Sequence, residues 1–286
     1  MDAPIALLVE EGGARLPLSN VSIVAEGTAW HALEAAHVEN KTRCELAAAY
    51  RLFHMYGLAP FDGESINFIA ARIPGSDMFL LNDYTLLWEE ITASSLLRIP
   101  LYEANRVGAE DGQPGAPQST NQRSLHRGRD SGVPEPIRRA MLLTVSHTLD
   151  TSTVASLKKG LQPLSQAGIM LANTVAHSHF DFYQDGPETV RLMAGKKIML
   201  QKWHGMFVAG SSLGECFYLA LSVDRAARAQ RALIQTGKPY FEPAAEEVAR
   251  WSRVYVDDPF YGGYDGERIW PAMVRKAMRL QPDLAM

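Results

Sequence analysis

The stretch KIMLQKWHGMFVAGSSLGECFYLALSVDRAARAQRALIQTG, residues 197–237, decides the fold class. Two short apolar runs, 197–201 and 206–209, have the length and composition of buried strands. From 212 to 236 the apolar residues instead recur at helical spacing along one face, and Gly237 supplies a helix stop. Two strands followed by a long amphipathic helix predict part of a layered α/β fold.

Strands and helices interleave along the rest of the chain in the same way. Thr42 and Glu45 have capping-box spacing, which predicts a helix that begins at Thr42 and ends before Gly57. Further strands are predicted at 66–73, 78–81, 98–102 and 141–145, and further helices at 152–159, from Pro243 onward and around 269–277. This alternation favours a three-layer α/β/α sandwich with a central mixed β-sheet over separate α and β domains.

The domain organisation follows from composition. Residues 1–39 mix short apolar runs with Gly and are interpreted as an N-terminal arm, and residues 40–286 as one domain. Inside that domain, residues 106–135 are rich in Gly, Pro, Ser, Gln and Arg and poor in apolar side chains. A stretch of this kind cannot bury enough surface to fold alone, so we expect a mobile loop. A loop without chemistry is favoured, and a functional loop is the alternative.

Charge and cysteine usage narrow the function classes. The chain has 28 basic and 32 acidic residues, a net charge of −4, so it has no basic surplus for nucleic acid. No apolar run approaches the roughly 18 residues of a membrane span, and the N-terminus does not resemble a signal peptide. The two cysteines, Cys44 and Cys216, exclude a disulfide framework. The expected compartment is the cytoplasm.

Four segments, read in order, resemble the class II aldolase/adducin family. They are 45–51; 66–75 followed by 79–82 and 90–96; 160–166; and Trp203-His204-Gly205 followed by 208–210 and Glu215-x-Phe217. The resemblance covers roughly residues 40–282, apart from the loop. It implies a homotetramer that acts on a small molecule, often with a divalent metal. In the family that metal is held by a His-x-His strand and a later histidine before glycine.

By this resemblance, two of the family's three metal-ligand positions carry a histidine in this chain, and the third does not. His204 matches the later histidine, and His147 matches the second histidine of the strand pair. Val145 stands at the first position and has no donor atom. Alternate residues of a strand face one way, so the family pair offers two imidazoles to one ion, and this chain offers one. Both histidines also have a purely structural alternative.

A second group of candidate ligands lies in the stretch His177-Ser-His179-Phe-Asp181. In extended structure, His177, His179 and Asp181 would share one side, and two histidines with a carboxylate can hold iron(II). The favoured alternative is a polar loop whose histidines are solvated or paired with carboxylates. Such a site could also be combined with His204.

Three residues at expected substrate-binding positions differ from the family pattern. Phe68 and Ala70 replace polar residues, and Trp203 replaces asparagine. These losses of hydrogen-bonding groups favour a less polar ligand. The family's acid/base glutamate cannot be assigned to any residue, because it falls in the altered loop region.

Three functions remain open at this point. The first is a class II aldolase-like lyase that performs aldol cleavage, decarboxylation or dehydration on a small carbonyl or hydroxy-acid substrate with zinc or manganese. The second is an enzyme repurposed for secondary metabolism, with an apolar pocket and either no metal or non-haem iron. The third is a non-catalytic scaffold comparable to adducins. Metal content would separate them.

Overall fold

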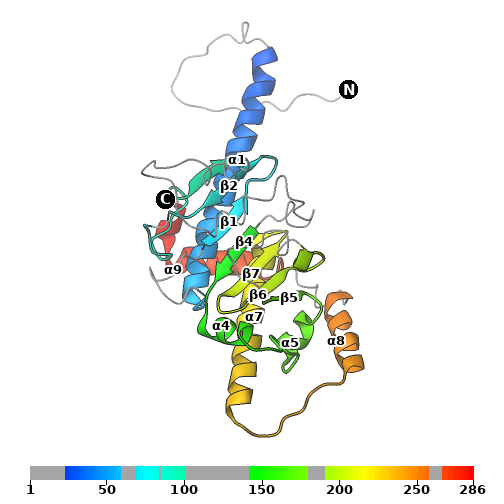
Figure 1. Cartoon of the computed structure of the whole chain (residues 1–286). Helices are drawn as coiled ribbons and strands as arrows, with labels where there is room; N and C mark the ends of the chain where they lie inside the picture. The colour runs from blue at the N-terminus through cyan, green and yellow to red at the C-terminus, as the bar shows by residue number, and fades with distance from the viewer. Residues whose placement is uncertain (1–22, 59–67, 84, 101–141, 180–190, 258–265) are drawn as a thin grey trace, which may run out of the picture. The chain divides into compact units, whose positions relative to one another are not determined.

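The structure, a computed structural model, describes residues 23–58, 68–83, 85–100, 142–179, 191–257 and 266–286 (Figure 1). By its internal contacts the chain divides into two compact units, residues 1–37 and 38–286. The predicted loop at 106–135 lies outside the described residues. Within the described part, no helix is long and apolar enough to cross a membrane.

The first helix, α1, spans Ile23–Met55 and is much longer than predicted. The predicted start at Thr42 is wrong, because Thr42 lies inside the helix and its hydroxyl donates to the carbonyl oxygen of Val38 at 2.8 Å. A threonine hydroxyl can bond backward to the preceding turn as well as cap a helix, so its spacing to Glu45 did not mark a start. The predicted end is confirmed, since Gly57 follows the helix with a φ of +69°.

In the described residues, seven strands form one sheet in the order β3-β2-β1-β4-β7-β6-β5. The strands are β1 (Phe68–Arg72), β2 (Met78–Leu81), β3 (Leu97–Pro100), β4 (Leu142–Ser146), β5 (Val175–Ser178), β6 (Ile198–Gln201) and β7 (Gly205–Gly210). Strands β5 and β6 pair in parallel, and every other neighbouring pair is antiparallel. The predicted mixed sheet is therefore confirmed.

The sequence pattern did not reveal every helix and strand of the described residues. The helices are α4 (Leu149–Ala155), α5 (Gln166–Leu171), α7 (Leu213–Gln235), α8 (Ala245–Asp257) and α9 (Trp270–Leu280), with a final 3-10 turn at Pro282–Ala285. Helix α7 begins as predicted, because the Ser212 hydroxyl accepts the Glu215 N–H at 3.1 Å. The short elements α5 and β5 were missed, and α4 begins three residues before its predicted start.

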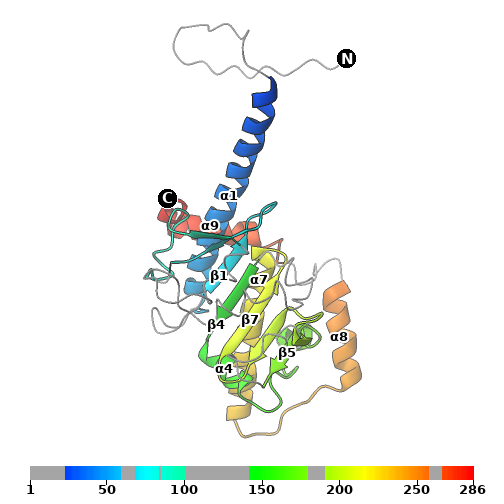
Figure 2. The ribbon, with the colours of Figure 1, turned by 45° about the horizontal axis from the view of Figure 1, so that its top comes forward.

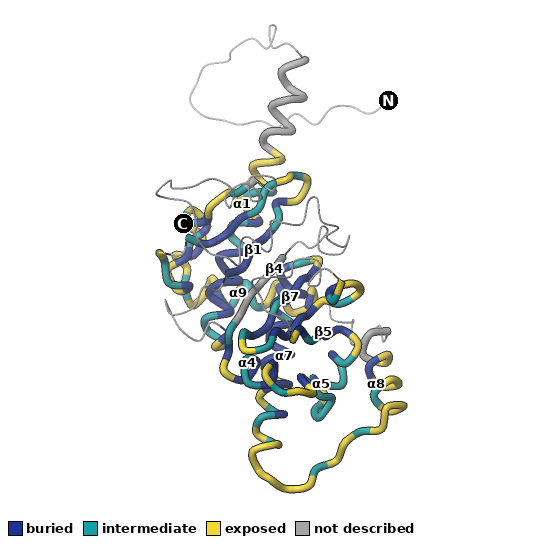
Figure 3. Tube along the Cα trace, viewed as in Figure 1, coloured by how far each residue is buried: buried dark blue, intermediate teal, exposed yellow. Residues whose placement is uncertain are grey.

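One face of the sheet packs against helices (Figures 1 and 2). The main hydrophobic core joins Ile69 of β1, Leu200 of β6 and Val208 of β7 to Phe53 of α1 and Phe217 of α7. The rings of Phe53 and Phe217 lie edge to face, with centroids 5.6 Å apart. Figure 3 shows the mostly buried strands β1, β6 and β7 and the buried first part of α7. Burial of this face stabilises the α/β arrangement.

The opposite face carries a separate apolar cluster. Phe68 and Ala70 of β1, Met199 of β6 and Ala209 of β7 belong to it, together with Met193 from outside the sheet. The described residues thus establish a helical layer on one face. The second helical layer of the predicted sandwich stays a prediction.

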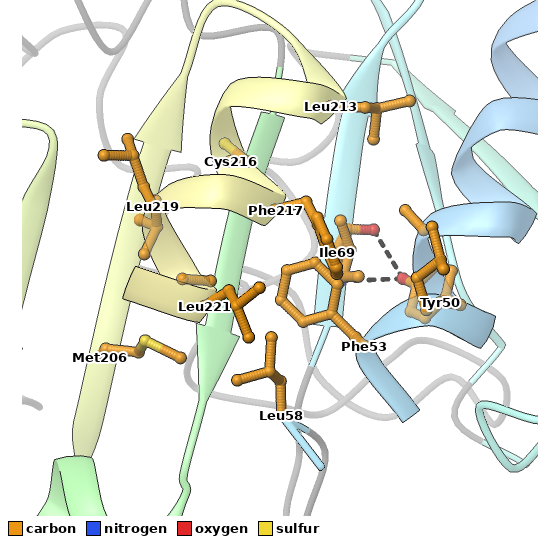
Figure 4. Packing of buried hydrophobic residues seen from close by; sticks show 14 of the residues in the cluster. Tyr50, Phe53, Leu58, Ile69, Met206, Leu213, Cys216, Phe217, Leu219 and Leu221 are labelled. Carbon is orange, nitrogen blue, oxygen red and sulfur yellow. Dashed lines mark hydrogen bonds between the residues drawn. The ribbon is translucent and has the colours of Figure 1, made fainter. Parts of the chain in front are cut away.

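Tyr50 of α1 ties the helical layer to the sheet (Figure 4). Its buried hydroxyl accepts the N–H groups of Ile69 at 2.9 Å and Asn82 at 3.1 Å. The same oxygen lies 2.6 Å from the Ile69 carbonyl oxygen and 2.7 Å from Oδ1 of Asn82. One hydroxyl therefore fixes β1 and the residue after β2 against α1, at the strand that carries Phe68.

Candidate functional site

The candidate site forms where β4 ends and β7 begins. These strands are antiparallel neighbours, with Ser146 opposite Met206. His147 follows β4 directly and His204 precedes β7 directly, so the register brings both to the same end of the sheet. Their ring centroids lie 4.4 Å apart, with an interplanar angle of 67°. The structure thus brings together the two histidines that the family resemblance identified.

Helix α4 holds both histidines in place. Thr148, the residue after His147, is the N-cap of α4, and its hydroxyl accepts the Thr151 N–H at 3.2 Å. One turn further along, the Ser152 hydroxyl donates to the carbonyl oxygen of His204 at 2.8 Å. The cap fixes the backbone beside one histidine and Ser152 fixes the backbone of the other.

The turn that carries His204 is strained at Trp203. This residue has a φ of +63°, in the left-handed region that bulky side chains rarely adopt. Its side chain is 78% exposed, and the Lys202 ammonium lies 4.0 Å from the ring centroid. The Trp203 N–H donates to the hydroxyl of Ser156, the residue that follows α4, at 3.3 Å. The exposed indole has little packing that could offset this unfavourable backbone conformation. The hydrogen bond to Ser156 helps to stabilise it.

Burial keeps both imidazoles neutral. The pKa of His147 is lowered to about 4, first by burial and second by the neighbouring charge of His204. Burial also lowers the pKa of His204. A neutral imidazole is the form that binds a metal or accepts a proton. At pH 7 the pair is therefore in the form that either role requires.

The pair fits a divalent metal in part. A catalytic zinc site usually has three protein ligands and an open position, and the pair supplies two imidazoles. Position 145 would supply the third, since it pairs with Phe68 and Phe207 on the sheet face that position 147 shares. Valine has no donor there, and in the described ranges no three His, Cys, Asp or Glu side chains gather around a common point.

His177 and His179 lie elsewhere. His177 is on the edge strand β5 and pairs with Leu200, which pairs in turn with Met206. Both of these residues belong to the helix-facing core. Its Nε2 accepts the Leu161 N–H at 2.9 Å, and its ring lies against Gly160. His179 follows β5 and is exposed, while Asp181 lies outside the described residues. Three strand spacings separate His177 from the end of β4, so the structure does not bring these histidines to His147.

Phe68 and Ala70 sit beside the site as part of the apolar face. Phe68 is fully buried and pairs with position 145 at the sheet end that carries the histidine pair. Ala70 lies two residues further along the same face. Among the described residues they pack with Phe207, Met199 and Met193. Their predicted contact with substrate stays a prediction.

Sequence reasoning missed Ser152 and Ser156. Both are serines four apart on one side of the short helix segment that follows His147, and both bond to the turn containing His204. The spacing was a usable signal, since residues four apart lie on one helix face. The function of the two serines depends on which turn the helix packs against, and that is known only from the tertiary structure.

Comparison with known proteins bears on the family and the fold of the chain. The family model for the class II aldolase and adducin N-terminal domain matches residues 44–231. A Pseudomonas aeruginosa protein assigned to the class 2 aldolases is 26% identical over 89% of this chain and 98% of its own length. Rat beta-adducin is 29% identical over 69% of this chain, which spans 27% of that protein. A crystal structure of an aldolase II superfamily protein from Pseudomonas syringae has a TM-score of 0.69 and 25% identity, covering 87% of this chain and 96% of that one.

The fold is therefore an α/β fold with a histidine pair at one end of a mixed sheet. The chain belongs to the class II aldolase and adducin family. The L-fuculose 1-phosphate aldolase of Glaciozyma antarctica shares the fold, with a TM-score of 0.66 at 15% identity over 94% of this chain and 96% of its own.

Proposed function

We propose that this protein is a lyase of the class II aldolase type that acts on a small carbonyl or hydroxy-acid substrate at the His147–His204 pair. The observation that carries the proposal is the contact between these two rings, whose centroids are 4.4 Å apart. Two neutral imidazoles from separate segments, held together by a helix cap and by Ser152, form a preorganised site.

His147 and His204 would hold a divalent metal, with zinc or manganese the expected ions. The neutral state of both rings favours ligation, because no proton has to be displaced. Such a metal acts as a Lewis acid on a carbonyl oxygen. The apolar face formed by Phe68, Phe207 and Met199 lies next to the pair and would limit the access of water. Family membership also supports a homotetramer in the cytoplasm as part of the proposal.

Metal content is the first test. We expect about one zinc or manganese per chain by inductively coupled plasma mass spectrometry on protein purified without a His tag or chelator. His204→Ala should abolish that binding while leaving the fold intact by circular dichroism. The matched control is His37→Ala, which removes an exposed histidine and should change nothing. Metal content unchanged in His204→Ala would show that the histidine is structural and would overturn the proposal.

Iron would indicate the second candidate, a repurposed oxygenase-type enzyme. In that case His179→Ala should lower the iron content, because the alternative site uses that residue. If His179→Ala retains all its iron, His179 is not an iron ligand and the second candidate is rejected.

A non-catalytic scaffold is the third candidate, and one observation favours it. Valine occupies the strand position at which a third imidazole would complete the ligand set. The adducins among the relatives, 28–29% identical over about two thirds of this chain, show that such sequence similarity extends to proteins not named as aldolases. Absence of bound metal after incubation with zinc, manganese and iron, together with an intact oligomer in solution, would support the scaffold.

A further inference from the structure

A polar row continues from the histidine pair across the sheet. Ser178 of β5 pairs with Gln201 of β6, and Gln201 pairs with Gly205 of β7. One step beyond the last β4–β7 pair, Ser146 with Met206, position 147 comes level with Gly205. One row across the sheet therefore contains His147, Gly205, Gln201 and Ser178. Gly205 has no side chain and leaves space between His147 and the amide of Gln201.

Alternation places this row on the apolar-cluster face. Phe207 and Met199 belong to that face, and Gly205 and Gln201 each lie two residues away from them along β7 and β6. The row thus borders the same cluster as Phe68. A ligand on this face would meet polar groups at the sheet end and apolar groups behind them.

Two buried side chains of this row each carry a polar atom that has no hydrogen-bond partner among the described residues. Ser178 is fully buried and Gln201 is 3% exposed. Within the part of the chain that the structure describes, neither Oγ of Ser178 nor Nε2 of Gln201 has a hydrogen-bond partner. Leaving a buried polar group unsatisfied destabilises a fold, and such groups in native proteins call for an explanation. Two of them in register, in the row of a candidate catalytic histidine, point to a ligand.

We propose that Gln201 and Ser178 form a subsite for the carboxylate of a hydroxy-acid or keto-acid substrate, whose hydroxyl or carbonyl end lies at His147 and His204. The amide nitrogen of Gln201 only donates and the Ser178 hydroxyl is able to donate, so one acceptor group satisfies both. These donors are uncharged, which suits a carboxylate better than a phosphate dianion, whose burial demands cationic partners.

Dimensions agree with a small acid. Neighbouring strands lie about 4.8 Å apart, so position 147 and Gln201 are roughly 10 Å apart between backbones, and a hydrogen bond of about 3 Å at each end shortens the gap that a substrate spans. A substrate of about three to five carbons bridges the remaining gap. This assignment deepens the proposed lyase function and rests on it for the identity of the reacting end.

Stability of the ligand-free protein gives the first test. Gln201→Met and Ser178→Ala remove unsatisfied polar atoms while keeping most of the side-chain volume, so each should raise the midpoint of thermal unfolding. The matched control is Gln230→Met. Gln230 is equally buried, but its amide donates to the Gly160 carbonyl oxygen at 2.9 Å and accepts the Gln162 N–H at 2.7 Å. That variant should lower the midpoint. A lower midpoint in both Gln201→Met and Ser178→Ala would overturn the assignment.

Binding gives the second test, with lactate, pyruvate and inorganic phosphate as probes in isothermal titration calorimetry. Lactate or pyruvate should bind the wild type and bind Gln201→Met about tenfold more weakly, the effect of losing one good hydrogen bond. Phosphate should neither bind nor compete. Equal binding of the acids to the wild type and Gln201→Met, binding of neither acid to the wild type, or binding of phosphate alone would each reject the subsite.

The two proposals fail in different ways. If the lyase proposal is wrong and the subsite is right, His204→Ala keeps its metal content while lactate binding still depends on Gln201. If the subsite is wrong and the lyase proposal is right, Gln201→Met leaves acid binding unchanged while His204→Ala loses the metal.

Discussion

The imidazole ring of His147 lies edge-on against that of His204, with centroids 4.4 Å apart, although the two residues belong to separate segments of the chain. Antiparallel pairing of β4 and β7 creates this contact. Helix α4 maintains it through its N-cap, Thr148, which follows His147, and through the bond from Ser152 to the His204 carbonyl oxygen. Two partly buried imidazoles at this distance disfavour protonation of each other. Burial first, and this contact second, therefore make His147 sensitive to acid.

Acidification should destabilise the protein through His147. Its pKa is about 4 in the folded chain, against an ordinary value of 6.5, so the unfolded chain binds the proton more strongly. The stabilisation is complete above pH 6.5 and is lost as the pH falls from 6.5 towards 4. Urea unfolding at pH 7.5, 6 and 4.5 should show this decline, and His147→Asn should flatten it. An equal slope in the wild type and His147→Asn would contradict the assignment.

Trp203→Asn should stabilise the protein. Left-handed backbone costs a bulky residue about 1–2 kcal/mol, and asparagine adopts it more readily. Removal of the exposed ring costs little stability. It removes mainly the contact with the Lys202 ammonium, which is worth about 0.5 kcal/mol at an exposed site. We expect a net gain of about 0.5–1 kcal/mol in the free energy of unfolding, measured in urea.

Trp203→Ala is the control for that gain. Alanine keeps the Cβ that makes the left-handed conformation costly, so removal of the indole alone should not stabilise the chain. An equal gain in both variants would show that the exposed ring, and not the backbone, is the source of the effect.

Ser152→Ala should loosen the turn that holds His204. The variant loses the 2.8 Å bond to the His204 carbonyl oxygen, which should cost about 1 kcal/mol. Titration of His147 followed by nuclear magnetic resonance should show its pKa moving up towards 6.5, because both the burial and the neighbouring ring depend on that turn. Ser152→Thr, which keeps the hydroxyl, should restore the value.

Thr153→Val separates this effect from the general loss of a helix hydroxyl. Among the described residues, the Thr153 hydroxyl donates within α4, to the Leu149 carbonyl oxygen at 2.7 Å. Its removal should leave the pKa of His147 unchanged. A rise in that pKa in Thr153→Val as large as in Ser152→Ala would show that the helix itself, and not its bond to the turn, controls the histidine.

Local patterns predicted much of the fold. Apolar periodicity and the Ser212 cap located α7, and the strand runs at 197–201 and 206–209 became β6 and β7 within a residue of their predicted bounds. Thr42 shows the limit of such reasoning, since a threonine hydroxyl bonds the same backbone whether it caps a helix or sits inside one.

The candidate site depended on strand pairing. A family resemblance could bring His147 and His204 to attention, but the placement of Ser178 and Gln201 in the row of His147 required the order of four strands. The same register sets His177 on the other face, with its Nε2 engaged by Leu161. Residues that look equivalent in sequence thus differ because adjacent strand positions face opposite ways.

Val145→His should create the missing third ligand. Position 145 pairs with Phe68 and Phe207 and lies two residues before His147, and alternate strand positions share one face of the sheet. A third imidazole completes the protein ligand set of a catalytic zinc site, so the affinity for zinc should rise by about tenfold or more. Competition with a chromophoric chelator measures the change. Val145→Asn, equally polar but a poor zinc ligand, should not raise it. An unchanged zinc affinity in a folded Val145→His protein would mean that His147 and His204 do not point to a common metal position.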